Sequence, residues 1–167
     1  MSDRVFLSKY NHKKLQWLHG AIFFVAVIIA LTLILLLFIG VSRVSGQSMS
    51  PTYKDGSVVF YLRRGREYSY GDVVAIKMAS GEKYIKRIVA LPGDTVDLQD
   101  GKLYVNGAME GNVYANGRTE PEVSTVKFPY TVEEGRYFVL GDNRENSVDS
   151  RTFGTISAAQ IRGRVLN

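Results

Sequence analysis

The sequence predicts a mainly β domain that follows one N-terminal transmembrane helix. Two observations lead to this fold class. Residues 21–39 carry no charge, and Thr32 is the single polar side chain among them. From residue 46 onward, short runs of Val, Ile, Tyr and Phe alternate with polar residues and are separated by Gly, Asp and Asn. Such alternation between turn residues is typical of β-strands.

The apolar segment is long enough to cross a bilayer. Its 19 residues would extend roughly 28 Å as a helix, close to the thickness of the hydrocarbon core. A buried core helix and a cleaved secretory signal are the alternatives. Fifteen of the residues are Leu, Ile, Val or Phe, which together favour membrane insertion by roughly 5–9 kcal/mol. Arg43 interrupts the small residues that a cleavage site would need. We therefore expect an uncleaved anchor over residues 20–40.

The charges on either side of the anchor predict its orientation. Four basic residues precede it, whereas only Arg43 follows it closely. Residues 1–19 are therefore expected in the cytoplasm, and residues 41–167 outside the cell membrane, after a single pass through the lipid bilayer. The exterior part has 17 Lys and Arg against 15 Asp and Glu. It lacks the basic excess of a nucleic-acid-binding domain, so no nucleic acid is expected as a partner.

The exterior part is expected to be all β. Its only helical signal is a turn around 157–160, and the polar stretch 108–124 is expected to be a loop or a small extension. The expected strands are 57–62, 72–78, 83–91, 94–98, 102–107, 125–132 and 136–141.

Missing residue types limit the chemistry of the exterior domain. The chain has no cysteine, and His12 and His19 both precede the anchor. A Ser-His-Asp triad, a cysteine nucleophile and a zinc site with His or Cys ligands are therefore excluded outside the membrane. Hydrolysis there would need Ser or Thr with a lysine base, a pair of carboxylates, or a metal held by oxygen ligands.

Three stretches contain the candidate site, and each has an ordinary interpretation when taken alone. One is a Ser-Pro turn, one is a strand with a solvated lysine, and one is an Asx-rich loop whose spacing does not fit an EF-hand calcium site. Together they supply a serine, a lysine in an apolar strand and a polar loop to orient both. Burial lowers the pKa of a lysine and makes it a base, as a Ser-Lys dyad requires. The stretches are QSMSPT (47–52), YIKRIVALPGD (84–94) and GDNRENSVDSR (141–151).

In this order and spacing, the three stretches resemble type I signal peptidases, in the short form with one anchor helix found in Gram-positive bacteria. The resemblance implies a signal-peptidase-type all-β catalytic domain that needs no cofactor or metal. It implies a serine endopeptidase that removes signal peptides, with small residues at −1 and −3, from exported preproteins. The family's nucleophile precedes Met-x-Pro-Thr, which selects Ser48 over Ser50. Its general base precedes Arg in the strand leading to Pro-Gly-Asp, which is Lys86.

The resemblance also implies roles for residues around this dyad. Ser147 would orient the lysine, Asp149 and Arg151 would form an ion pair, and Asp142 would support the loop. The Ser48 N–H would be the main oxyanion donor, because Gly46 stands where some relatives place a second donor, a serine. The substrate would lie as an added strand beside Tyr84 and Ile85. The expected pocket residues are Val44, Met49, Tyr53, Tyr84 and Ile85.

The last residues also differ from the family pattern. GRVLN lacks the aromatic-rich end that is usual in the family, so the last strand is expected to be shorter or less firmly packed than in relatives.

Two other functions share parts of this pattern. A relative that serves in pilin processing or pilus assembly would keep the fold, and a purely structural assembly factor could lack the dyad. Here both Ser48 and Lys86 are present. A self-cleaving Ser-Lys repressor shares the chemistry, but it is soluble and carries a DNA-binding domain, which the anchor helix argues against.

Overall fold

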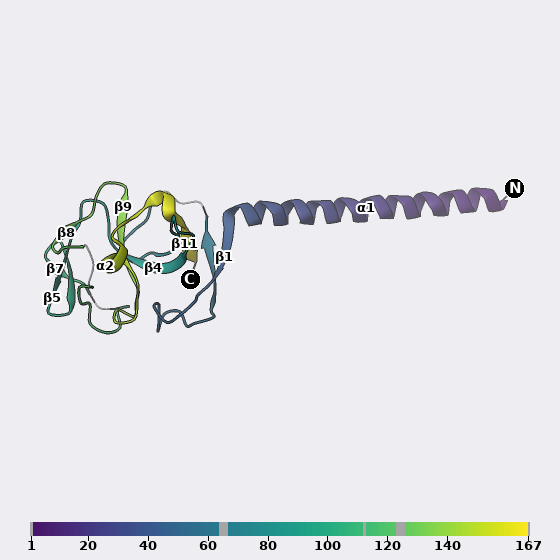
Figure 1. Cartoon of the computed structure of the whole chain (residues 1–167). Coiled ribbons are helices and arrows are strands. Elements are labelled where there is room, and N and C mark those ends of the chain that lie inside the picture. The colour runs from purple at the N-terminus through teal and green to yellow at the C-terminus, as the bar shows by residue number, and fades with distance from the viewer. Residues whose placement is uncertain (1, 64–66, 112, 123–125, 167) are drawn as a thin grey trace. The chain divides into compact units, whose positions relative to one another are not determined.

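The computed structural model describes residues 2–63, 67–111, 113–122 and 126–166. The chain divides into two compact units, Met1–Phe38 and Ile39–Asn167. The first is a single helix, α1 (Ser2–Phe38), and the second contains all the strands (Figure 1). This arrangement confirms the predicted fold class of a mainly β domain after one apolar helix.

Helix α1 contains the predicted apolar segment. Its stretch Leu15–Phe38 has a mean hydropathy of 3.2, which is long and apolar enough to cross a membrane by length and composition. The helix ends at Phe38, two residues before the expected end of the anchor at residue 40. Ile39 already belongs to strand β1 (Ile39–Arg43), which pairs antiparallel with β2 (Val58–Leu62). Pairing with β2 therefore sets the helix boundary, which hydrophobicity alone could not locate.

The β domain consists of two antiparallel sheets. The larger has the strand order β1-β2-β11-β3-β4-β9-β10, and the smaller has the order β7-β6-β5-β8. The remaining members of the larger sheet are β3 (Val73–Lys77), β4 (Lys83–Ala90), β9 (Arg136–Leu140), β10 (Ile156–Ser157) and β11 (Ile161–Leu166). The smaller sheet consists of β5 (Thr95–Gln99), β6 (Lys102–Val105), β7 (Ala108–Met109) and β8 (Tyr130–Thr131).

The predicted strands that carry clear apolar patterns are present. β2, β3, β4, β6 and β9 lie within five of the expected ranges, and β5 extends one residue beyond a sixth, 94–98. The expected turn at 157–160 contains a 3₁₀ helix, Ala158–Gln160. The range 125–132 holds only β8, and its first residue lies outside the described residues. The polar stretch 108–124 contributes β7, a short strand that was not expected.

The last strand differs from the expectation. β11 has six residues and lies between β2 and β3, so both of its edges are paired. Its side chains alternate between buried and exposed, and Val165 is 5% exposed. The prediction of a less firmly packed final strand is therefore wrong, because pairing on both edges and alternate burial hold this strand without aromatic residues.

Strand β4 is the structural centre of the domain. It pairs with β3 along Lys83–Arg87 and with β9 along Arg87–Ala90. From Ile85 to Ala90 every side chain is buried, because both faces of the strand are covered by apolar clusters. A lysine at position 86 is thus fixed inside the domain, not displayed on its surface.

Candidate active site

Ser48 lies in a tight turn that its neighbours hold in place. Ser50 N–H donates to the Gln47 carbonyl (3.0 Å), and Tyr53 N–H donates to the Met49 carbonyl (2.8 Å). The Met49 side chain is completely buried in the cluster that contains Val44 and Ile85. Its burial fixes the turn to the domain and leaves Ser48 half-buried at the surface of the site.

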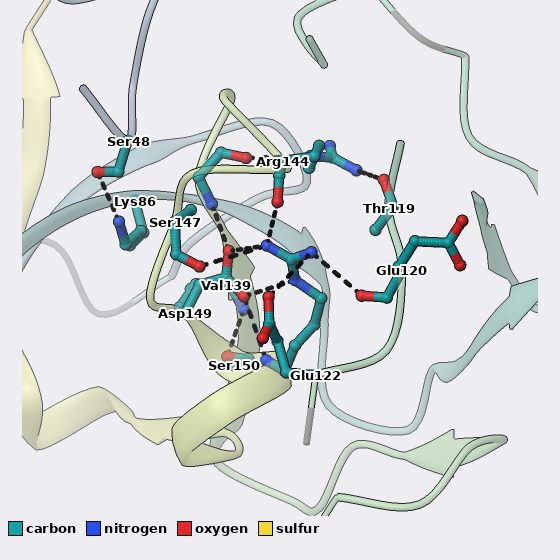
Figure 2. A network of polar contacts seen from close by, with 12 residues as sticks. Ser48, Lys86, Thr119, Glu120, Glu122, Val139, Arg144, Ser147, Asp149 and Ser150 are labelled. Atoms are coloured by element: carbon teal, nitrogen blue, oxygen red, sulfur yellow. Dashed lines mark hydrogen bonds and ion pairs between the residues drawn. The ribbon is translucent and has the colours of Figure 1, made fainter. Parts of the chain in front are cut away.

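Lys86 and Ser48 are in direct contact. Lys86 Nζ donates a hydrogen bond to Ser48 Oγ over 2.7 Å, as Figure 2 shows. The lysine is 1% exposed, and its Nζ lies 5.7 Å from the centroid of the Tyr84 ring. Because burial removes the hydration of the ammonium, the pKa of Lys86 falls to about 8. The Asp149 and Asp142 carboxylates oppose this decrease in pKa, and Arg151 adds to it.

This pKa makes Lys86 a usable base near neutral pH. A lysine with an ordinary pKa near 10.4 is neutral in less than about one molecule per thousand at pH 7, whereas a pKa of about 8 leaves roughly a tenth neutral. A neutral amine 2.7 Å from a serine hydroxyl can accept its proton. The pair therefore has the geometry and the electrostatics of a nucleophile and its base.

The loop 141–151 is built around a buried ion pair. Arg151 Nε donates to Asp149 Oδ1 and Arg151 Nη2 donates to Asp149 Oδ2, both over 2.9 Å, and the two side chains are 1% and 0% exposed. Asp149 also accepts from the Gly141 N–H and is the N-cap of α2 (Ser150–Phe153). Arg151 Nη2 donates to the Arg144 carbonyl over 2.6 Å (Figure 2). The expected ion pair is thus present, and it ties both ends of the loop together.

A second buried ion pair joins all three motifs. Arg87 donates through Nε and Nη2 to the two oxygens of Asp142 (2.8 and 2.7 Å), and Thr52 Oγ1 donates to the same carboxylate. Asp142 is completely buried. Asp142 therefore supports the loop as expected, because its carboxylate connects the loop to β4 through Arg87 and to the serine turn through Thr52. Asn143 N–H adds a hydrogen bond to the Ser48 carbonyl (3.0 Å).

Ser147 lies against Gly141, and its hydroxyl has no described hydrogen-bond partner. Among the described residues, its Oγ is the one buried side-chain oxygen or nitrogen that lacks a partner. A Cβ built on Gly141 would collide with both Ser147 Oγ and the Ser48 carbonyl oxygen. Only glycine at position 141 therefore lets the loop pack this closely against the serine turn. The structure gives Ser147 no hydrogen bond to Lys86, so the expected orienting contact stays a prediction.

The backbone before Ser48 is oriented by Asp55. The Gly46 N–H donates to Asp55 Oδ1 over 2.8 Å, and Gly46 has a φ of 83°, a conformation that favours glycine. The Ser48 N–H has no acceptor within the part of the chain that the structure describes. It is therefore free to donate to the oxyanion that forms on a carbonyl oxygen when the Ser48 hydroxyl attacks its carbon.

Comparison with known proteins identifies the family. The chain matches the family described as "Signal peptidase, peptidase S26" over residues 15–166. The chain belongs to this family. It is 39% identical over 161 residues to a signal peptidase I of Bacillus licheniformis, an alignment that covers 89% of this chain and 84% of that protein. It is 36% identical over 141 residues to signal peptidase IB of Staphylococcus aureus strain COL, with 73% of each chain covered.

A solved signal peptidase I from Enterococcus faecalis V583 is also similar, with 35% identity, a TM-score of 0.49, and coverage of 60% of this chain and 97% of that one. The family match and the two sequence relatives confirm the resemblance inferred from the three motifs. As a member of the S26 signal peptidases, the chain is a serine endopeptidase by family.

In this signal peptidase domain, a small hollow of about 50 Å³ borders Ser48. Val44, Tyr84 and Ile85 line it, whereas Met49 is completely buried and Tyr53 is partly buried in the apolar cluster that also contains Val44 and Ile85. Tyr84 belongs to the opposite apolar cluster, where its ring stacks on Phe153 with 5.8 Å between centroids. Three of the five expected pocket residues thus line the hollow, whereas Met49 and Tyr53 pack in the apolar cluster without lining it.

Several residues of the site were not identified from the sequence. Arg87 and Thr52 bind Asp142, and Arg144 binds Glu110 (2.8 Å) and Thr119 (2.9 Å) while it is 1% exposed. An arginine next to Lys86 in an apolar strand was the available signal for Arg87, because a second buried cation requires a carboxylate partner. No sequence signal points to Thr119 or Glu110, which come from the polar stretch 108–124.

Proposed function

We propose that this chain is a membrane-anchored signal peptidase I in which Ser48 is the nucleophile and Lys86 is the general base. The observation that carries the proposal is the 2.7 Å hydrogen bond from Lys86 Nζ to Ser48 Oγ, together with the lowered pKa of that lysine. The substrates are preproteins whose signal peptides have small residues at −1 and −3. Helix α1 holds the enzyme in the membrane, with its N-terminus on the cytoplasmic side.

The reaction begins when Lys86 accepts the proton of Ser48. Ser48 Oγ bonds to the carbonyl carbon of residue −1, and the carbonyl oxygen becomes an oxyanion that the Ser48 N–H binds. As the tetrahedral intermediate collapses, the C–N bond breaks and Lys86 gives its proton to the leaving amine. Water then attacks the acyl-enzyme while Lys86 removes its proton. That proton returns to Ser48 Oγ, and the signal peptide leaves with a free carboxylate.

The strand edges beside Ser48 fit an extended substrate. Residues Lys83–Lys86 of β4 pair with β3 on one side, whereas β9 begins to pair only at Arg87, so one edge of this segment is unpaired. β1 is the terminal strand of the same sheet. Both strands line the small hollow at Ser48. A peptide added along these edges would place alternate side chains, those of −1 and −3, toward the apolar surface of Val44 and Ile85.

The position of the dyad along the chain supports cleavage at the membrane surface. Ser48 follows Phe38, the last residue of α1, by ten residues, which span at most about 35 Å when extended. If α1 crosses the bilayer, the reacting hydroxyl stays within this distance of the outer surface. A signal peptide that is itself held in the bilayer presents its cleavage site at the same depth.

The test compares single variants of the full chain, purified in a neutral detergent, on a preprotein whose cleavage is followed by electrophoresis and N-terminal sequencing. Ser48→Ala and Lys86→Ala should each abolish cleavage, because the members of one catalytic unit fail together. Ser50→Ala is the matched control and should retain activity. Cleavage by Ser48→Ala at the wild-type rate, or its loss in Ser50→Ala alone, would overturn the assignment.

A further inference from the structure

A second, basic hollow adjoins the one at Ser48. It has a volume of about 290 Å³, and four of its lining residues are cationic, namely Arg63, Lys77, Lys83 and Arg162. No acidic residue lines it. Lys83 and Tyr84 line both hollows, as does Ser42 of β1. The two hollows are therefore neighbouring parts of one groove along β1 and β4.

Strand register places the basic residues in line with the apolar surface. Ala75 of β3 lies opposite Ile85 of β4, and both belong to the apolar cluster beneath the Ser48 hollow. Two residues further along, Lys77 lies opposite Lys83. Because side chains alternate across a strand, these lysines lie on the same face as Ala75 and Ile85. That face changes from apolar to basic within about 7 Å.

The cluster of cations is uncompensated within the described residues. Like charges directly opposite each other on paired strands are destabilising. None of the four cations has a described carboxylate within the 4.0 Å limit of an ion pair. Glu82, which precedes Lys83 in the chain, accepts a hydrogen bond from Ser80 Oγ over 2.9 Å. A bound anion would relieve the repulsion that the fold leaves in place.

The basic hollow is closer along the chain to the end of α1 than Ser48 is. Val41 lines the basic hollow and follows Phe38, the last residue of α1, by three residues, which span at most about 11 Å. If α1 crosses the bilayer as proposed, the basic hollow is close to the membrane surface. A signal peptide runs from the membrane to its cleavage site, so it passes the basic hollow before Ser48. The residues that pass there are on the leader side of the scissile bond.

We propose that the basic hollow is a subsite for an acidic side chain at position −5 of the signal peptide. This inference rests on the proposed function, which sets −1 at Ser48 and turns −1 and −3 toward Val44 and Ile85. Because side chains alternate along an extended chain, the side chain of −5 points toward the same face as those of −1 and −3. It lies about 13 Å from −1, in the basic part of that face. The side chain at −4 points away from that face and has no such partner.

The test is a set of peptides that span −7 to +3 with Ala at −1 and −3. Glu, Gln or Lys is placed at −5 in one series and at −4 in the other, and kcat/KM is measured with the full chain in neutral detergent. At −5, Glu should exceed Gln by about two- to fivefold and Lys should fall below Gln by a similar factor, as for exposed ion pairs. The preference should shrink as salt is raised. At −4 the three peptides should be cleaved equally.

Charge reversal supplies the matched variants. Lys77→Glu and Lys83→Glu should each weaken or invert the preference at −5, whereas Lys102→Glu, an exposed lysine of the other sheet, should preserve it. Equal cleavage of all −5 peptides by the wild-type enzyme would overturn the subsite and leave the proposed function intact. Cleavage of no peptide would overturn both. If Lys77→Glu and Lys83→Glu instead lose binding to phosphatidylglycerol vesicles without any effect at −5, the hollow binds lipid phosphate and the proposal is wrong.

Discussion

At the residue scale, the Ser147 hydroxyl differs from the other buried polar groups that the structure describes, because it has no hydrogen-bond partner. A buried hydroxyl without a partner costs stability, roughly 1–3 kcal/mol. It lies against Gly141, whose other neighbour is the Ser48 carbonyl. A hydroxyl kept here at a cost in stability is suited to hold the lysine amine once that amine leaves Ser48 Oγ during the reaction.

Replacement of Ser147 should therefore slow cleavage without lowering the stability of the domain. Ser147→Ala should lower kcat/KM by about 10²-fold, because a misplaced base lengthens proton transfer, and should leave the unfolding temperature unchanged or slightly raised. Ser150→Ala is the matched control, since Ser150 Oγ accepts from the buried Val139 N–H over 2.9 Å. It should lower the unfolding temperature with little effect on rate. A stable Ser147→Ala enzyme of full activity would remove Ser147 from the site.

At the scale of elements, the loop 141–151 depends on the Asp149–Arg151 pair. Removal of one partner leaves a buried, uncompensated charge, which costs roughly 3–5 kcal/mol. Asp149→Ala and Arg151→Ala should each lower the unfolding temperature by roughly 10–20 °C for a domain of this size. Thermal unfolding of the full chain in detergent measures this change.

An exposed ion pair supplies the comparison for that experiment. Arg118 and Glu120 are 63% and 54% exposed, and Arg118→Ala should shift the unfolding temperature by only a few degrees, because such pairs contribute about 0–1 kcal/mol. Similar small shifts for Asp149→Ala and Arg118→Ala would mean that the loop does not depend on its buried pair.

The strands of the domain differ in how well the amino-acid sequence predicts them. β3 and β4 carry dense apolar patterns, so their existence and type follow from hydrophobicity and β-propensity. β1 was missed because its first residues continue the apolar run of α1. A last strand was expected at GRVLN, but the full extent of β11 was not, because IRGRVL carries two arginines and a glycine. Local pattern cannot show that β11 lies between β2 and β3, since that position depends on pairing with residues about 85–105 positions earlier in the chain.

The candidate site shows the same limit. Ser48, Lys86 and the loop 141–151 were found because motif spacing carries chemical information. Thr52 and Arg87 were not, because their partner Asp142 lies far along the chain and only the fold brings the three together. The lone hydroxyl of Ser147 and the basic hollow likewise depend on three-dimensional packing, which spacing does not encode.

At the scale of the whole molecule, the dyad links stability to pH. The pKa of Lys86 is about 8 in the folded domain and about 10.4 in an unfolded chain. Between these values the folded state binds fewer protons, so the free energy of unfolding should rise with pH from about 8 to 10.4. Below pH 8 the full cost, roughly 3 kcal/mol, is present.

Lys86→Met isolates this contribution, because methionine fills similar space without a charge. At pH 7 the variant should be more stable than the wild-type chain by roughly 3 kcal/mol, and the difference should close as the pH approaches 10.4. Urea unfolding in detergent, followed by near-ultraviolet circular dichroism, measures it at each pH. A difference that does not vary with pH would show that Lys86 titrates as an ordinary lysine.

The pH dependence of kcat/KM tests the Ser48–Lys86 dyad most directly. The β domain contains no histidine, so no ordinary side chain with a pKa near 7 can provide the base. On a peptide with Ala at −1 and −3, kcat/KM should rise with pH along a single-proton limb whose midpoint lies near 8, where Lys86 becomes neutral. A profile that is flat from pH 5 to 10, or one whose midpoint lies at the pKa of a free lysine, would contradict the mechanism.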